Sequence, residues 1–316
     1  MKRIIFLILT LCTLLTFTAC SCGACKKAEP SYDGAYFLRN YKEGKVANVL
    51  ETAEYSVKFK EETLSSTKDK VIPNVTGSLV TELSTEVLNE IKYYKFKTTL
   101  TLVGTYTFNE QVHQVNDVTT STVWFLGKDD FFRPLKTEKS VKCLTPFVEK
   151  QTNTSKVVFN SYDFTYTIDY SGANAKINLT DNLKTENLEI MVNKFFSKTF
   201  CENELLIFYP RLFNLNQGFS RDVKTITLNG AESLKMSISS YNADVKATFN
   251  GKEKTVKTDV IQYYLPGDYP GAPLNVYLAN FNDNNSLYKA PIKIEKPITL
   301  VGTQQYDLVS FTHNEI

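Results

Sequence analysis

The residues of this chain best suited to catalysis or metal binding are its six cysteines and two histidines. Cys22 and Cys25 form a C-x-x-C pair just after Cys20. Such a pair can act as a redox dithiol or supply half of a zinc site. Closing a four-ligand zinc site requires a second pair, and none follows in the sequence. We therefore predict no metal site, and interpret Cys22 and Cys25 as extra acylation sites, a small disulfide or plain thiols.

The two histidines limit the catalytic chemistry, because a Ser-His-Asp triad would have to use one of them. His113 falls within Gln111–Val115, which alternates as a strand with a mixed face. His313 lies three residues from the end, where fraying is expected. The sequence contains no G-x-S-x-G, P-loop or G-x-G-x-x-G motif. We predict that the protein is not an enzyme and has no catalytic residues and no cofactor.

The N-terminus has the pattern of a secretory signal: Lys2 and Arg3, an apolar run over 4–17, and small residues before Cys20. Phe17-Thr18-Ala19-Cys20 resembles the bacterial lipoprotein lipobox. The resemblance implies that residues 1–19 are removed and that the Cys20 thiol is lipidated, carrying palmitate-type acyl chains. Two acyl chains give a stable membrane anchor. An uncleaved anchor helix and an ordinary secretory cut are the alternatives, but a spanning helix needs about 20 apolar residues.

The lipobox predicts a protein on the extracytoplasmic face of the cell membrane, within the cell envelope. Removal of Lys2 and Arg3 leaves 34 of the 36 basic residues, equal to the 34 acidic ones. A neutral mature chain without a basic block is a poor binder of a phosphate backbone. We therefore predict membrane contact through lipid and no nucleic-acid partner.

Small polar residues over 20–34 predict a lipidated tether or linker, and 35–316 a β-rich domain. Cys143 and Cys201 lie within that domain. A disulfide between them is possible outside the cytosol. Two buried free thiols are an equal alternative, because free cysteine packs as a small hydrophobic residue.

Period-two alternation is the main secondary-structure signal. Phe96 and Leu102 fall on one side of a strand at 94–102, with lysines and threonines on the other, and 163–170 alternates in the same way. A strand with one apolar face and one polar, solvent-exposed face indicates an antiparallel sheet. The fold class predicted is mainly β, or β-rich α+β: a curved antiparallel sheet or half-barrel with a few helices packed against it.

Three helices are predicted. They cover 35–52, a segment from Thr180 that carries an apolar stripe to Phe196, and 202–209 before Pro210. The strands then form two possible subregions, about 35–179 and 222–316, around a helical segment at 180–212.

This order of elements, together with the lipobox, is similar to the LolA/LppX-type half-barrel envelope lipoproteins. The resemblance implies a curved sheet with an apolar concave face, although a two-sheet sandwich fits the strands almost as well. With 21 Phe and 18 Tyr, we predict a non-enzymatic lipoprotein that binds an apolar or amphiphilic ligand, such as a lipid, or an envelope component. The alternative is a structural or protein-interaction module that meets another envelope protein.

Overall fold

The structure is a computed structural model. It describes residue 38 and residues 49–314, except 61–69, 89, 128–131, 152–153, 171, 173, 182–184, 192–199, 228–229, 265–272, 281–286 and 288. The chain divides into two units, Met1–Ser31 and Tyr32–Ile316, and the described residues all belong to the second. The predicted signal peptide, Cys20, Cys22, Cys25 and the 20–34 tether lie outside the described residues.

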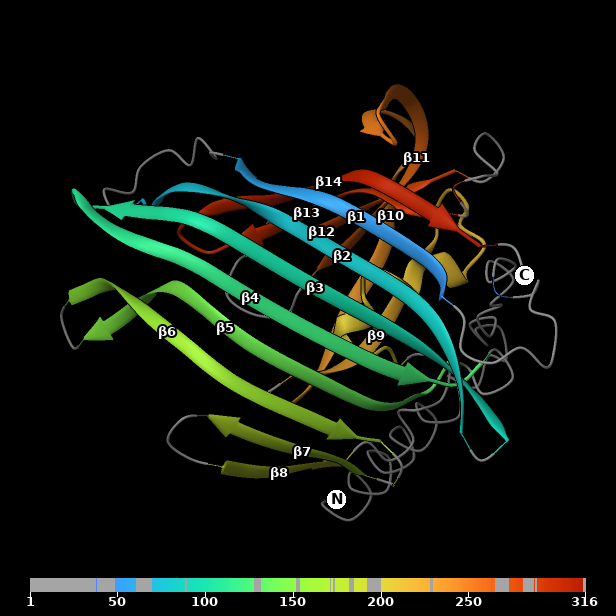
Figure 1. The fold of residues 1–316 in the computed structure, drawn as a ribbon, viewed down its shortest axis with the longest axis horizontal. Helices are drawn as coiled ribbons and strands as arrows, with labels where there is room; N and C mark the ends of the chain where they lie inside the picture. The colour runs from blue at the N-terminus through green and yellow to red at the C-terminus, as the bar shows by residue number, and fades with distance from the viewer. Residues whose placement is uncertain are drawn as a thin grey trace, which may run out of the picture. The chain divides into compact units, whose positions relative to one another are not determined.

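Fourteen strands of the described residues form one antiparallel sheet (Figure 1). Its order is β8-β7-β6-β5-β4-β3-β2-β1-β14-β13-β12-β11-β10-β9. Each strand therefore pairs with its neighbours in sequence, except that β8 does not pair with β9. The additional pairing of β1 with β14 joins the two strand groups. The strands are β1 (Val49–Lys60), β2 (Ile72–Leu88), β3 (Ile91–Phe108), β4 (Gln111–Phe125), β5 (Pro134–Gln151), β6 (Thr154–Asp169), β7 (Asn174–Asp181), β8 (Thr185–Met191), β9 (Ser220–Thr227), β10 (Gly230–Phe249), β11 (Lys252–Tyr264), β12 (Leu274–Ala279), β13 (Pro291–Ile298) and β14 (Gly302–His313).

The predictions of a mainly β chain and of antiparallel sheet are confirmed, and both groups of strands belong to the same sheet. The sheet has two edges, β8 and β9, which do not pair with each other among the described residues. The expected alternation is also present: Tyr94, Phe96 and Leu102 are buried on one face of β3, and Tyr166, Ile168 and Tyr170 on one face of β6 and the residue after it. We call this face of the sheet the inner face.

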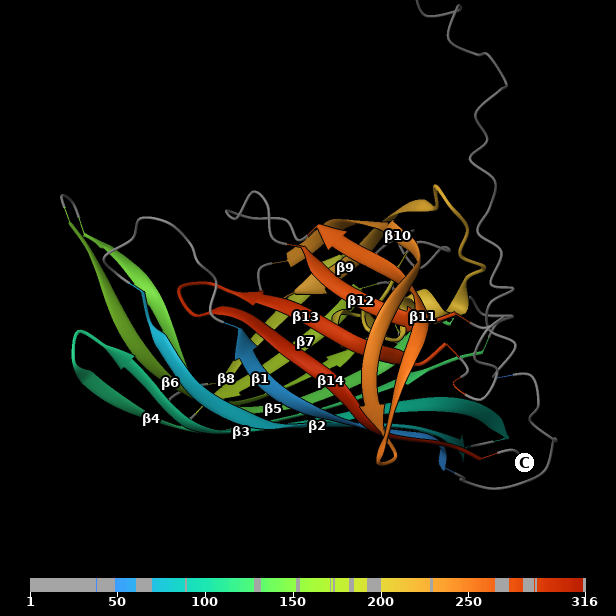
Figure 2. The same cartoon turned by 90° about the horizontal axis from the view of Figure 1, so that it is seen from above.

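Glycines allow the long strands to bend. Gly77 of β2 and Gly104 of β3 both lie on the inner face. They are diagonal neighbours, because Gly77 is opposite Leu102, two residues before Gly104. Gly104 has a φ of +141°, and a Cβ there would lie 2.1 Å from the carbonyl oxygen of Asn74. Glycine within a strand marks a tight bend or a close backbone approach. Figure 2 shows β2–β6 bending along their length.

Residues 200–213, which we call the plug, pack against the inner face. The plug contains the 3-10 turns η3 (Asn203–Leu205) and η4 (Tyr209–Leu212). Phe208 lies 5.3 Å from Phe96 and 5.7 Å from Phe125, ring centre to ring centre. On the opposite side, the Tyr263 hydroxyl of β11 donates to the Leu206 carbonyl at 2.9 Å. The plug therefore joins β3 and β4 to β11, which lie far apart in the strand order.

The prediction of a few helices is wrong for the residues that the structure describes. Residues 49–52, the end of the first expected helix, belong to β1, and most of the rest of that range is outside the described part. In the second expected helix, residues 185–191 form strand β8. Asn187 and Glu189 alternate there with Leu188 and Ile190, and the strand pairs with β7. The third expected helix, 202–209, is replaced by the 3-10 turns η3 and η4. Pro210 would in any case have ended an α-helix there. The described residues of the expected helical segment at 180–212 therefore form strands and 3-10 turns, not an α-helix.

No helix among the residues described has both the length and the apolar character needed to cross a membrane.

Candidate functional site

A group of polar side chains occupies the middle of the inner face, which we call the polar cluster: Lys139, Cys143, Tyr166, Glu204 and Lys296. Strand alternation places Lys139 on the inner face of β5, opposite Tyr166 of β6. The plug supplies Glu204, whose Oε1 lies 2.6 Å from the Lys139 Nζ. The Tyr166 hydroxyl donates to the same oxygen at 3.4 Å.

Lys296 belongs to a strand that is distant from β5 in the strand order of the sheet. It lies on β13, on the same face as Ile292 and Ile294. Six strand intervals separate β13 from β5, and at ~4.8 Å each they would span about 29 Å in a flat sheet. Yet the charge of Lys296 interacts with those of Lys139 and Glu204. The sheet therefore curves so that β5 and β13 face each other across its inner face.

Lys296 is accessible to solvent, but charged groups of the plug and of β5 act on it. Its side chain is exposed, but loss of bulk solvent, followed by repulsion from Lys139, lowers its pKa below the ordinary lysine value. Glu204 offsets this only in part. Among the described residues, no carboxylate forms an ion pair with Lys296.

The two carboxylates of the plug differ in charge state. Burial alone would raise the pKa of Glu204, but the charge and hydrogen bond of Lys139 hold it below the usual range. Burial, followed by repulsion from Glu204, raises the pKa of Glu202 to about 8. Glu202 caps η3, because its Oε2 accepts the Glu204 backbone N–H at 2.6 Å. At neutral pH Glu202 is therefore mostly protonated, and Glu204 carries the negative charge that pairs with Lys139.

Aromatic rings cover a neighbouring part of the inner face, which we call the aromatic wall: Phe59, Tyr106, Phe108, His113 and Phe159. His113 stacks on Phe159 with ring centres 3.7 Å apart, and Phe59 meets Tyr106 edge-on at 6.3 Å. His113 thus lies on a strand, as its alternation predicts. Phe59, Phe108, His113 and Phe159 are only half-buried, so the wall keeps accessible apolar surface.

The register joins the aromatic wall to the polar cluster. Phe59 of β1 is opposite Gln304 of β14, and Gln304 is opposite Lys296 of β13. Two strand intervals therefore separate Phe59 from Lys296 on the same face, about 10 Å at the usual spacing. An apolar surface adjoining a cationic group is the arrangement that an amphiphile requires.

The plug is fixed to the sheet by a buried ion pair. Arg211 of η4 donates from both terminal nitrogens to Glu51 of β1, at 2.5 and 2.7 Å, and both side chains are at most 5% exposed. His313 Nδ1 lies 3.4 Å from the second Glu51 oxygen. The expectation of a frayed His313 is wrong, because β14 extends to this residue and pairs with Glu51.

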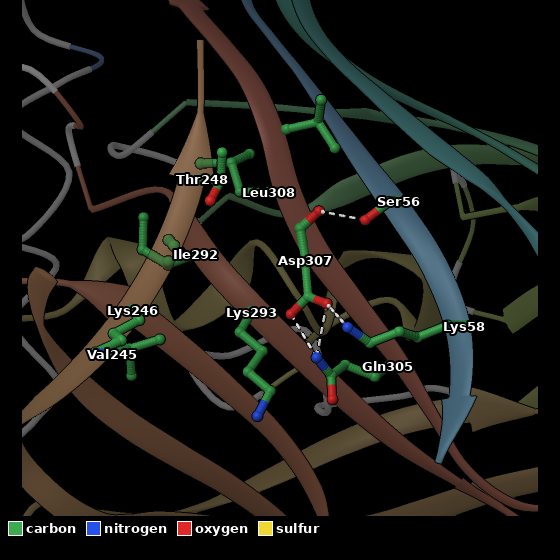
Figure 3. A pocket seen from close by; sticks show the side chains of 12 residues that line it. Ser56, Lys58, Val245, Lys246, Thr248, Ile292, Lys293, Gln305, Asp307 and Leu308 are labelled. Carbon is green, nitrogen blue, oxygen red and sulfur yellow. Dashed lines mark hydrogen bonds and ion pairs between the residues drawn. The ribbon is translucent and has the colours of Figure 1, made fainter. Parts of the chain in front are cut away.

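A hollow with a volume of about 360 Å³ lies on the opposite, outer face of the sheet (Figure 3). It lies where β10 passes over β13 and β14; the Asn250 backbone N–H at the β10–β11 turn donates to Val309 at 2.7 Å. Figure 3 shows Asp307 held between Lys58, at 2.8 Å, and the side-chain amide of Gln305. Its carboxylate is therefore already bound within the protein.

Both cysteines of the folded unit are free thiols in the structure. Burial raises the pKa of the Cys143 thiol above its ordinary value, and burial raises that of Cys201 further. Neither is therefore a reactive thiolate at neutral pH. The disulfide stays a prediction for the oxidised protein.

No group of three or more His, Cys, Asp or Glu in the described part of the chain could hold a metal ion. Comparison with protein-family models, curated proteins and solved structures finds no match to this chain.

No motif in the sequence predicts the polar cluster, but the strand phases of two lysines are a signal for it. Ile292, Ile294 and Ile298 share one strand phase, and Lys296 interrupts that phase. Lys139 interrupts the phase of Val141 in the same way. A lysine at an apolar phase is a polar group that the fold must accommodate on its inner face.

Proposed function

We propose that this protein is a membrane-anchored extracytoplasmic lipoprotein, not an enzyme, whose inner face binds an amphiphilic ligand. The observation that carries the proposal is the half-exposed aromatic wall adjoining the polar cluster. Ligand sites are concave, mainly apolar and aromatic, with a few placed polar groups. The inner face fits this description, with the sheet curved as a half-barrel around the plug.

The location rests on Cys20 and the lipobox. Lipidation at Cys20 would tether the folded unit to a bilayer, where amphiphiles are concentrated. The ligand would then pass between membrane and inner face without crossing much water, and the protein would act as a carrier or a sensor of that amphiphile.

The test measures how much amphiphile stays bound to the full chain during purification. The protein is expressed with its own signal in a bacterial host, purified, extracted with organic solvent and analysed by mass spectrometry. Phe159→Asp introduces a charge into the aromatic wall. Val112→Asp is the matched control, since Val112 neighbours His113 but is 58% exposed on the outer face.

We expect an amphiphile at near one equivalent per protein in the wild type and in Val112→Asp, and a loss of most of it in Phe159→Asp. No retained amphiphile in any of the three, or equal amounts in all three, would contradict the proposal.

One observation favours the alternative of a protein-interaction module. Val80, Val103 and Val118 lie on the outer face of β2, β3 and β4 and are 37–49% exposed. Exposed apolar patches can mark a protein interface. Crosslinking on intact cells tests this alternative: a partner joined through these valines, together with an empty inner face, would make it the better account.

A further inference from the structure

Lys296 is the inner-face group that the folded chain does not explain by itself. Its neighbours on the same face of β13 are isoleucines, and an apolar residue in its place would avoid the loss of solvation. Lys139 and Glu204 already neutralise each other at 2.6 Å. A single positive charge is therefore left exposed on the inner face.

The other acidic groups nearby would not repel an anion strongly. Glu202 is mostly protonated at neutral pH. Asp117 accepts the Leu144 backbone N–H at 3.0 Å and is not among the charges that act on Lys296. The groups that face Lys296 are thus Lys139, Glu204 and the Cys143 thiol, and the charge of the two lysines exceeds that of Glu204 by one.

We propose that Lys296 binds the anionic headgroup of the amphiphile, a carboxylate or a phosphate monoester, while the apolar chain lies along the aromatic wall. The inference rests on the proposed function and names its ligand class. The separation of about 10 Å between Lys296 and Phe59, two strand intervals, lets one ligand touch both. Glu204 holds Lys139 in place and leaves Lys296 as the headgroup contact.

The outer-face hollow is a poorer anion site. Lys58 is bound to Asp307 at 2.8 Å, and Lys293 to Glu295 at 2.6 Å. At these two lysines an anion would have to displace a carboxylate of the protein, which the anion at Lys296 would not. Lys246 also lines this hollow, but no aromatic ring of the described residues does, so the hollow offers no surface like the aromatic wall for an apolar chain.

The test is photolabelling of the full chain in isolated bacterial membranes, with two probes that differ only in the headgroup. Diazirine-tagged stearic acid carries a carboxylate, and diazirine-tagged stearyl alcohol carries none. Lys296→Met removes the charge and keeps an unbranched side chain, while Lys296→Arg keeps the charge. Lys97→Met is the control, since Lys97 is exposed on the outer face of β3. Resistance to protease confirms that each variant is folded.

A hydrogen bond to a charged partner contributes enough for roughly a tenfold change in affinity. We compare the probe concentrations that give half-maximal labelling. For the wild type, Lys97→Met and Lys296→Arg, we expect this concentration to be about tenfold lower for the acid probe than for the alcohol probe. Lys296→Met removes this preference and leaves alcohol labelling unchanged. Competition by unlabelled oleic acid and by lysophosphatidic acid then shows whether the carboxylate or the phosphate is preferred.

Equal labelling of the wild type by both probes, with no effect of Lys296→Met, would overturn the headgroup inference and leave the proposed function in place. Labelling of the wild type by neither probe would overturn both.

Discussion

Removing Arg211 should be the most damaging change of a single charge in the described part of this protein. Arg211 is 2% exposed and makes a bidentate pair with Glu51, which is 4% exposed. In Arg211→Met the Glu51 carboxylate stays buried without its main partner. Breaking a buried pair from one side costs about 3–5 kcal/mol. The entropy of unfolding at the midpoint scales as ~2.1 cal/mol/K per residue, or about 0.6 kcal/mol/K for a folded unit of this size. We therefore expect Tm to fall by about 5–8 °C.

The double variant Glu51→Met, Arg211→Met is the matched control. Replacing both partners of a buried ion pair with apolar residues of similar volume is often neutral or stabilising. We expect most of the lost stability to return, with Tm within about 3 °C of the wild type. Scanning calorimetry at pH 7 measures all three proteins.

The same pair predicts a pH dependence. Burial would raise the pKa of Glu51, but Arg211 holds it below the ordinary value. A depressed carboxyl pKa contributes stability that is present above the unfolded value and is lost as pH falls through the folded value. In acid the wild type should therefore lose stability relative to the double variant, which has no Glu51 carboxyl to protonate. A shift under about 1 °C for Arg211→Met, or a double variant as unstable as the single one, would refute the reasoning.

Three further predictions concern Glu202 of the plug, Gly104 of β3 and Cys20 of the lipobox. Glu202 has its pKa raised to about 8, so folding becomes less favourable as pH rises from the unfolded value towards 8, by on the order of 1 kcal/mol per pH unit; urea titrations of Glu202→Gln should lack this slope, and an unchanged slope would assign it to another group. Gly104→Ala should lower the free energy of unfolding by about 3 kcal/mol or more, because it combines a positive φ with a backbone clash, whereas a loss under 1 kcal/mol would mean that β3 adapts. Cys20→Ser should abolish labelling of the chain by an alkyne-tagged palmitate in growing bacteria, and undiminished labelling would contradict lipidation at Cys20.

Most of the sheet could be predicted from local sequence because alternation reports which face is buried. Phe96 and Leu102 lie inside as the period-two pattern requires, since each strand of a one-sided sheet repeats the same choice. The segment near Leu188 failed because its apolar residues match a helical stripe as well as a short strand. Pairing with β7 decided between them, and pairing is a long-range property that a local pattern does not contain.

The site was less predictable than the sheet for the same reason. Lys139 and Lys296 are 157 positions apart in the sequence, and only the curvature of the sheet brings their charges together. Glu204 comes from the plug, whose place on the inner face depends on the Arg211–Glu51 pair. The aromatic excess did point to a binding surface, but it could not separate rings that fill the core, such as Phe208, from those of the aromatic wall.

The position of a photolabel in the chain shows whether the inner face binds an amphiphile. Diazirine-tagged stearic acid is photolysed on intact cells, and the modified peptides of the purified protein are sequenced by mass spectrometry. The account predicts labels on the aromatic wall, in the peptides that carry Tyr106, His113 and Phe159. Labels confined to outer-face positions such as Val80 and Val118 would contradict it.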